Sequence, residues 1–332
     1  MNHPKYSIII PVYNRPDEVD DLINSLTKQT AKNFEVIIVE DGSAIPCKNI
    51  VDHYQDSLTI SYFEKPNTGP GTTRNYGAER AKGNYFIFFD SDCIIPKNYL
   101  SEVDSELTSS PVDAFGGPDR SHHTFTPIQK AISYSMTSFF TTGGIRGGKE
   151  RLDKFYPRSF NMGISKEVFE NTGGFSKMRF GEDVDFSLRI IEAGFSTRLF
   201  PKAYVYHKRR TNFRQFYKQV FNSGIARINL YLLHPSSLKF VHLLPSAFTL
   251  GMIFIFLLAV LFPLLLVIPL TYCTLVFTHS LFINKSLSVA TLSIAAAWVQ
   301  LFGYGLGFIK SAWQRLVLKR GEFKAFEKNF YS

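Results

Sequence analysis

The sequence predicts an α/β domain with a mostly parallel sheet, followed by C-terminal transmembrane helices. Apolar runs without polar alternation, such as Ser7–Val12, Phe34–Val39 and Tyr85–Phe89, are typical of strands buried on both faces of a sheet. A helical apolar pattern over residues 17–30 separates the first two runs. Strand, helix and strand in this order predict a βαβ unit with parallel strands. Long apolar runs near the C-terminus predict the membrane region.

Further elements are expected along the first two thirds of the chain. They are a strand at Ile60–Phe63, a helix that the loop 67–77 enters and that runs to about Ala81, a helix at about 96–107, a strand at 112–117, a helix from Lys166, a helix over 182–194 and a last strand over Phe195–Tyr206. The stretch 119–157 is rich in glycine and fits either a lid over a ligand or a plain flexible insertion.

Charge is distributed unevenly along the 332 residues, of which 45% are apolar. Residues 1–192 carry 21 Lys and Arg against 26 Asp and Glu, a net charge of −5. Residues 193–321 carry 14 basic side chains and no acidic one. This asymmetry predicts an acidic soluble half and a basic half that faces a membrane. Nucleic acid is not expected as a partner, because the basic half is also strongly apolar.

The cysteines and the N-terminus indicate the compartment. Cys47, Cys93 and Cys273 lie far apart and lack metal-ligand spacing, which suits structural thiols in a reducing environment. The N-terminus has only a short apolar run before Pro11, which is not typical of a signal peptide. We therefore expect the first half of the chain to lie in the cytoplasm.

Two carboxylates follow the buried strand at Tyr85–Phe89. Asp90 and Asp92 are placed where the chain leaves the sheet, at the edge where open α/β sheets bind ligands. Paired carboxylates at such an edge suit Mg²⁺ or Mn²⁺ shared with substrate phosphates. The alternative is that both aspartates only cap the next helix.

A glycine-rich loop and further charged residues complete this predicted site. The loop at 67–77 permits close approach of its backbone to a ligand, and its Arg74 is suited to bind a diphosphate. Asp41, at the end of the second strand, opens onto the same edge. These features together predict a nucleotide-diphosphate site.

A second carboxylate cluster begins the helix predicted over 182–194. Glu182, Asp183 and Asp185 fall on its first turn, where the helix dipole favours negative charge. The pattern alone leaves open whether the cluster stabilises the helix or takes part in chemistry.

The segments SIIIPVYNRP, VEDGS, NTGPGTTRNYG and FFDSDC together resemble the family 2 glycosyltransferases, from about residue 5 to residue 210. The resemblance implies the GT-A fold and the inverting transfer of a sugar from a nucleotide-diphosphate sugar, with a UDP-sugar as the expected donor. It also implies Mg²⁺ or Mn²⁺ as the cofactor.

The resemblance implies roles for the residues of the nucleotide site. Pro11 and Val12 would line the nucleoside pocket with main chain, and Asp41 would bind the base or ribose. Arg74 and Asn75 match the Arg-Asn of the family's A-R-N-x-G segment, in which Thr73 stands here for the usual Ala. Asp90 would meet hydroxyls of the sugar or ribose.

The resemblance also assigns the metal and the base. Asp92 would ligate the metal, and Asp183 of the Gly-Glu-Asp sequence would deprotonate the acceptor hydroxyl, with Glu182 and Asp185 supporting it or binding the acceptor. His207 is either a further metal or phosphate ligand, or a surface residue.

The domain boundaries follow from these patterns. We expect a catalytic domain at 1–210, an amphipathic interface segment at 211–240, a transmembrane region at 241–310 and a basic tail at 311–332. Two spans, which return the tail to the cytoplasm, agree with the positive-inside rule, and a third span or a re-entrant segment is the alternative. The amphipathic stretch alternatively packs on the catalytic domain.

Anchoring at a membrane predicts a lipid-linked or membrane-proximal glycan as acceptor. The arrangement is similar to bacterial enzymes that build surface polysaccharide, which places the chain at the inner (cytoplasmic) membrane with its catalytic domain on the cytoplasmic side. Two other functions are considered: a nucleotidyltransferase, which would need a more basic loop after the first strand, and a membrane-bound nucleotide-binding scaffold without turnover.

Overall fold

The computed structural model describes residues 3–120, 122, 124–142 and 155–321. The chain divides into two compact units. In the described residues, unit 1 comprises 3–120, 122 and 155–207, and unit 2 comprises 124–142 and 208–321. Each unit is described by itself. Most of the glycine-rich stretch 141–149, with Arg146 and Lys149, lies outside the described residues.

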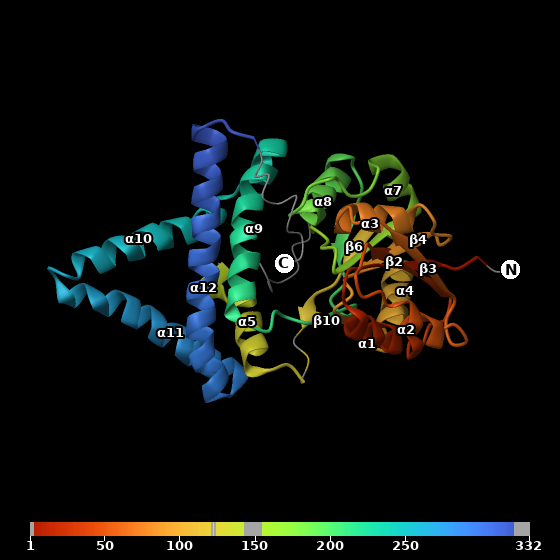
Figure 1. The fold of residues 1–332 in the computed structure, drawn as a ribbon, viewed down its shortest axis with the longest axis horizontal. Helices are drawn as coiled ribbons and strands as arrows, with labels where there is room; N and C mark the ends of the chain where they lie inside the picture. The colour runs from red at the N-terminus through yellow and green to blue at the C-terminus, as the bar shows by residue number, and fades with distance from the viewer. Residues whose placement is uncertain (1–2, 121, 123, 143–154, 322–332) are drawn as a thin grey trace. The chain divides into compact units, whose positions relative to one another are not determined.

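Unit 1 is built on a seven-stranded sheet with the order β3-β2-β1-β4-β8-β6-β9 (Figure 1). Strands β3, β2, β1 and β4 are parallel, β8 is antiparallel to both β4 and β6, and β6 is parallel to β9. The predicted mostly parallel α/β sheet is therefore confirmed. The strands are β1 (Tyr6–Val12), β2 (Phe34–Asp41), β3 (Ile60–Lys65), β4 (Tyr85–Phe89), β6 (Ala114–Gly116), β8 (Asn161–Ser165) and β9 (Thr197–Leu199).

Helices cover both faces of this sheet, which is why its central strands are mostly apolar. Ile8 and Ile10 of β1 belong to the core shared with α1 (Pro16–Thr27), α2 (Lys48–His53) and α4 (Tyr99–Ser109). Ile9, between them, belongs to the core on the other face, with α3 (Pro70–Ala78), α7 (Lys166–Thr172) and α8 (Glu182–Glu192). Alternate residues of one strand thus enter opposite cores.

The single strand expected over Phe195–Tyr206 is wrong, because the chain forms two strands there. After β9 it turns at Pro201, where the Ala203 N–H donates to the Phe200 carbonyl at 3.1 Å. Proline has no N–H for a sheet ladder, which favours a break at this point. The chain then enters a second sheet of order β5-β10-β7, formed by β5 (Cys93–Ile94), β10 (Val205–His207) and β7 (Asp119–Arg120).

Unit 2 is helical. Its central helix is α12 (Leu287–Ala312), which contacts α5, α9, α10 and α11 (Figure 1). The helices of this unit are α5 (Pro127–Thr137), α6 (Phe139–Thr142), α9 (Phe213–Leu233), α10 (Leu244–Leu258), α11 (Val267–Asn284), the 3-10 turns at Pro235–Ser237, Phe240–His242 and Pro263–Leu266, and a π-helical turn at Trp313–Val317.

The helix predicted to lie at a membrane interface, α9, packs along α12. A Cβ atom at Gly307 would lie 2.1 Å from the Phe221 carbonyl oxygen, and one at Gly224 would lie 2.2 Å from the Tyr304 carbonyl oxygen. Glycines thus let the two helix backbones approach closely. Two helical segments of this unit, Pro263–Asn284 and Leu287–Val317, are long and apolar enough to cross a membrane.

We predict that Gly163→Ala destabilises unit 1. A Cβ atom at Gly163 would lie 2.0 Å from Cζ of Phe115, whose ring is stacked on Phe200 with centroids 4.6 Å apart. Overpacking of this kind costs about 1–3 kcal/mol. Urea denaturation of the full chain in detergent measures the free energy of unfolding.

The control for this substitution is Gly321→Ala, because nothing lies within 4 Å of a Cβ atom at Gly321. A change of less than about 0.5 kcal/mol is expected there. Equal effects of the two substitutions would contradict the packing described for β8.

Candidate active site

The site lies where β4 leaves the large sheet, and it begins with Asp92. The Asp92 side chain is 12% exposed and accepts a hydrogen bond from Nη1 of Arg15 at 2.7 Å. Arg15 is the residue immediately before α1. Strand β4 therefore delivers the carboxylate, and the turn after β1 supplies its countercharge.

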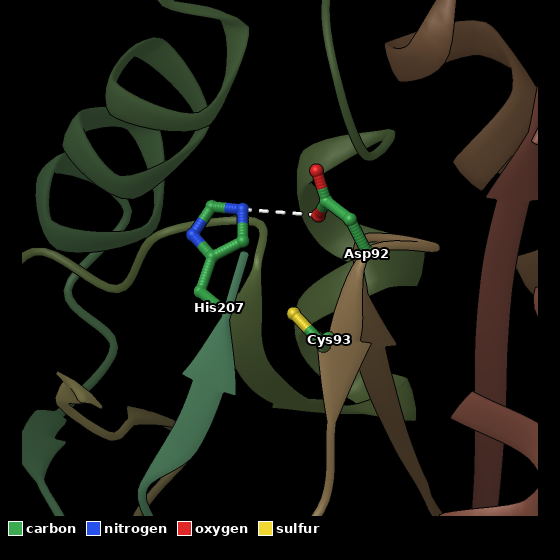
Figure 2. Close-up of side chains that lie close together, drawn as sticks. All are labelled: Asp92, Cys93 and His207. Carbon is green, nitrogen blue, oxygen red and sulfur yellow. Dashed lines mark ion pairs between the residues drawn. The ribbon is translucent and has the colours of Figure 1, made fainter. Parts of the chain in front are cut away.

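His207 reaches Asp92 because β10 pairs with β5. In this antiparallel pairing His207 lies opposite Cys93, and its imidazole stacks on Phe160 with centroids 5.0 Å apart. Figure 2 shows the imidazole directed toward the Asp92 carboxylate, with Nε2 3.1 Å from Oδ1. Nε2 also lies 3.9 Å from Oδ2 of Asp90.

The donor set at this point suits a divalent cation. One possible ligand atom from each of Asp92, Cys93 and His207 lies within 4.8 Å of the others (Figure 2). Burial raises the pKa of the Cys93 thiol well above its ordinary value, so the thiol stays protonated and is a poor ligand. Carboxylate oxygens and an imidazole nitrogen remain, and these donors suit Mn²⁺ better than Ca²⁺, which prefers oxygen ligands only.

Arg74 connects this point to the second carboxylate cluster. It extends from α3, its side chain is 4% exposed, and it donates from Nη2 to Asp90 at 2.6 Å and from Nη1 to Glu182 at 3.1 Å. Its guanidinium also lies over the Phe175 ring, 5.2 Å from the centroid. One buried arginine therefore joins the acidic ends of β4 and α8.

The pKa values of the neighbouring Glu182 and Asp183 are shifted in opposite directions. Both lie in the first turn of α8, which follows Gly181 with φ +84°. Burial and the Asp183 carboxylate raise the pKa of Glu182 to about 7. Burial also acts to raise the pKa of Asp183, but the Arg158 guanidinium, which donates from Nε at 2.6 Å, outweighs it and holds that pKa below its ordinary value. Asp183 is therefore ionised at neutral pH.

Asp41 lies at the end of β2 and holds the glycine-rich loop. Its Oδ1 accepts from the Thr68 N–H and its Oδ2 from the Gly69 N–H, each at 2.9 Å. Lys65 also pairs with this carboxylate. Asp41 is only 1% exposed, so its clearest contribution is to fix the loop that precedes Arg74.

Four other predicted residues lie around the site. Asn75 donates to the Phe175 carbonyl and accepts from the Phe175 N–H, each at 2.8 Å. Asp185 pairs with Arg189 at 3.0 Å. Val12 has its side chain in the core and Pro11 is partly exposed, so main chain is what this end of β1 presents.

The structure adds two arginines whose roles the sequence did not indicate. Arg15 was visible only as the single positive charge after the first strand, and Arg158 only as one of several basic residues around the glycine-rich stretch. Their pairing with Asp92 and Asp183 depends on the fold. The one sequence signal for a role of Arg15 was its position immediately after the first strand. No sequence pattern indicated that Arg158 lies at the site.

We predict that Arg74→Gln destabilises the chain at pH 7 by about 3–5 kcal/mol, because it leaves the buried Glu182 and the partly buried Asp90 without their countercharge. The loss should shrink as the pH falls below about 7, since Glu182 then binds a proton and needs no countercharge. Urea denaturation between pH 5 and 8 measures both effects.

Lys48→Gln is the control for this prediction. It breaks the exposed pair of Lys48 with Asp52 and should cost about 0–1 kcal/mol. An equally small loss at Arg74→Gln would show that these ion pairs do not stabilise the fold. A large loss that does not change with pH would show that Glu182 does not bind a proton in this range.

A model of the family described as Glycosyl transferase family 2 matches residues 7–173. The glycosyltransferase AglE of Haloferax volcanii is 28% identical over 243 residues, which cover 71% of this chain and 77% of AglE. An uncharacterized glycosyltransferase of Rickettsia conorii is 33% identical over 141 residues, 42% of this chain and 23% of that protein. The chain thus spans most of one of these relatives and less than a quarter of the other.

A solved structure shares the fold. The mannosyltransferase PcManGT from Pyrobaculum calidifontis, in complex with GDP-Man and Mn²⁺, superimposes with a TM-score of 0.63 at 15% identity, over 95% of this chain and 89% of that one. The family model covers half of the sequence, and the parallel sheet with carboxylates at its edge agrees with it. The chain is therefore a glycosyltransferase and belongs to glycosyltransferase family 2.

Proposed function

We propose that the enzyme transfers a sugar, with inversion, from a nucleotide-diphosphate sugar to a hydroxyl of a lipid-linked or membrane-proximal glycan in polysaccharide or cell-envelope biosynthesis. The observation that carries the proposal is the link, through Arg74, between the Asp90–Asp92–His207 edge and the Glu182–Asp183 pair. This network puts residues suited to a donor diphosphate and a candidate base in one site.

The donor end is assigned to the strand edge. Asp92 and His207 would hold Mn²⁺ or Mg²⁺, and Asp90 would bind sugar or ribose hydroxyls. The Mn²⁺ and GDP-Man bound to the Pyrobaculum enzyme support this assignment. When bound, the ion supplies positive charge that stabilises the departing diphosphate. Arg15 supplies a further cation beside Asp92.

The nucleoside end is assigned to β1, β2 and the glycine-rich loop. Pro11 and Val12 would present main chain to the nucleoside, and Asp41 would serve the base or ribose while its two amide contacts fix the loop. Arg74 and Asn75 hold the walls of this region. We propose a UDP-sugar as the donor, with a GDP-sugar as the alternative to be tested.

The base is assigned to Asp183. Its carboxylate removes the proton of the acceptor hydroxyl, the hydroxyl oxygen bonds to the anomeric carbon, and the bond from that carbon to the diphosphate oxygen breaks on the opposite face. Arg158 keeps Asp183 ionised before the acceptor arrives. Glu182 supports the base through Arg74, and Asp185 supports the helix that carries it.

The acceptor and the location are inferred from unit 2. Its two segments that are long enough to cross a membrane support anchoring at a bilayer, and a lipid-linked acceptor would then lie at the same surface. We propose residues 1–210 as the catalytic domain, 211–240 as an interface segment, 241–310 as the membrane region and 311–332 as a basic tail. The excess of basic residues favours the cytoplasmic face of the inner membrane.

Calorimetric titration of the detergent-solubilised chain with UDP and with GDP tests the donor site. We expect one nucleotide to bind in the presence of Mn²⁺ and not with EDTA, because its diphosphate needs the cation for charge neutralisation. Asp92→Asn should abolish this binding. Asp56→Asn, an exposed substitution of the same charge, should leave it unchanged, and binding that is insensitive to EDTA and to Asp92→Asn would refute the assignment.

Asp183→Asn tests the base. The amide cannot accept the proton, so sugar transfer should fall by about 10²- to 10⁴-fold, while the nucleotide affinity measured by calorimetry stays the same. Radiolabelled sugar transferred to the lipid fraction of membranes reports turnover. Turnover within threefold of the wild type would show that another group removes the proton.

A further inference from the structure

Helices α10 and α11 of unit 2 form an apolar hairpin. Both helices contact α12, and Figure 1 shows them leaving α12 and converging on the turn that joins them. This turn contains the 3-10 helix at Pro263–Leu266. Residues 240–284 include no Asp, Glu, Lys or Arg, and residues 250–270, around the turn, include no polar side chain. The hairpin thus becomes more apolar toward its tip.

The side chains at the tip of the hairpin are exposed. Val260 and Leu264 are each 81% exposed, and Leu261 and Phe262 are exposed by 73% and 60%. A turn that faces water is normally polar, whereas a continuous exposed apolar surface marks a place of interaction. The tip therefore suits contact with hydrocarbon.

The backbone of the tip meets the condition that hydrocarbon imposes. In the core of a bilayer, N–H groups need partners within the chain, because no water is present. The N–H groups of Leu261 and Phe262 donate to the Leu258 carbonyl at 2.9 and 2.8 Å. The Leu265 N–H donates to the Phe262 carbonyl at 3.0 Å, and Pro263 has no N–H. The turn can therefore lie in lipid without leaving these donors unpaired.

Hydroxyl groups farther along α11 are satisfied in the same way. Thr271, Thr274 and Thr278 each donate to the carbonyl oxygen four residues earlier, at 2.8, 2.9 and 2.8 Å. A hydroxyl that bonds to its own helix avoids the free energy cost of an unpaired polar group in an apolar environment. These exposed threonines are thus compatible with contact with lipid.

The length of the hairpin limits how deep its tip can lie. Helix α10 has 15 residues and α11 has 18, which correspond to about 22 and 27 Å at the α-helical rise. The hydrocarbon core of a bilayer is about 30 Å thick. Because the shorter helix limits the depth of the turn, the tip ends within the core rather than in water on the far side.

Helix α12 is long and apolar enough to cross a membrane, but the helix beside it is not. Close backbone contacts at Gly224 and Gly307 hold α9 along α12. Helix α9 carries Arg214 and Lys218, whose side chains are exposed. Charged side chains are costly in the hydrocarbon core but favourable beside lipid headgroups. The two packed helices therefore suit the membrane interface.

We propose that α10 and α11 form a re-entrant hairpin. The hairpin enters the hydrocarbon core from one face of the membrane and returns to the same face, where α9 and α12 lie, and its partner is the acyl chains of the lipids. The proposal rests on the proposed anchoring at a membrane. It replaces the expected transmembrane spans with an anchor that leaves both ends of α12 on one side.

Cysteine accessibility in membranes tests the hairpin. A membrane-impermeant maleimide is added to right-side-out and to inside-out vesicles that contain the full chain, and the wild type with its three native cysteines gives the background. Ser288→Cys and Arg320→Cys, at exposed positions near the two ends of α12, should be labelled from the same side. Leu264→Cys should react from either side about ten-fold more slowly than Ser288→Cys, because a thiol in apolar surroundings does not form the reactive thiolate. Detergent should remove this difference.

Val260→Cys, a second tip position with the same exposure as Leu264, serves if Leu264→Cys does not fold. Tip labelling as fast as that of Ser288→Cys, from whichever side, would overturn the hairpin. Labelling of Ser288→Cys and Arg320→Cys from opposite sides would overturn it as well, because α12 would then cross the membrane.

Carbonate washing of the same vesicles separates this proposal from the proposed anchoring. A chain that stays in the membrane, with either of the two contrary labelling results, would refute the hairpin and leave the anchoring in place. A chain that carbonate extracts would refute both. Nucleotide titration of the detergent-solubilised chain reports separately on the donor site.

Discussion

The structure of the site depends on keeping several carboxylates close together in a largely buried position. Asp90, Asp92, Glu182 and Asp183 would repel one another if they were left alone, and a buried charge without a partner is strongly destabilising. Each is paired with an arginine: Arg15 with Asp92, Arg74 with Asp90 and Glu182, and Arg158 with Asp183. The folded chain can therefore retain a dense cluster of carboxylates.

These countercharges explain much of the topology around the site. Arg15 comes from the turn after β1, Arg74 from α3, and Arg158 from the segment before β8. The chain also leaves the large sheet after β9 and enters the small one at β10, which brings His207 to Asp92. Elements that are distant in sequence thus meet at the acidic edge and supply its countercharges and its histidine.

The sequence predicted the parts of this structure that depend on local patterns. The buried strands appear as apolar runs, and Asp90, Asp92 and Asp183 stand out because carboxylates follow a strand or begin a helix. The sequence did not predict the break at Pro201, because the apolar residues on both sides of the proline together predict one strand. Nor did it identify Arg158 as the partner of Asp183, since the choice among several basic residues is made by tertiary structure. Asp41 was expected at the nucleoside, and the structure shows that it also holds the glycine-rich loop, because that contact depends on backbone N–H groups that a sequence pattern does not reveal.

The central claim is that Asp92 and His207 together form the metal-binding part of a glycosyltransferase site. Pulsed electron paramagnetic resonance of Mn²⁺, bound to the chain with the nucleoside diphosphate that it prefers, tests this claim most directly. We expect coupling of the Mn²⁺ electron spin to a ¹⁴N nucleus in the wild type, and loss of that coupling in His207→Gln. Mn²⁺ that binds with the nucleotide but shows no nitrogen coupling, or coupling that persists in His207→Gln, would contradict it.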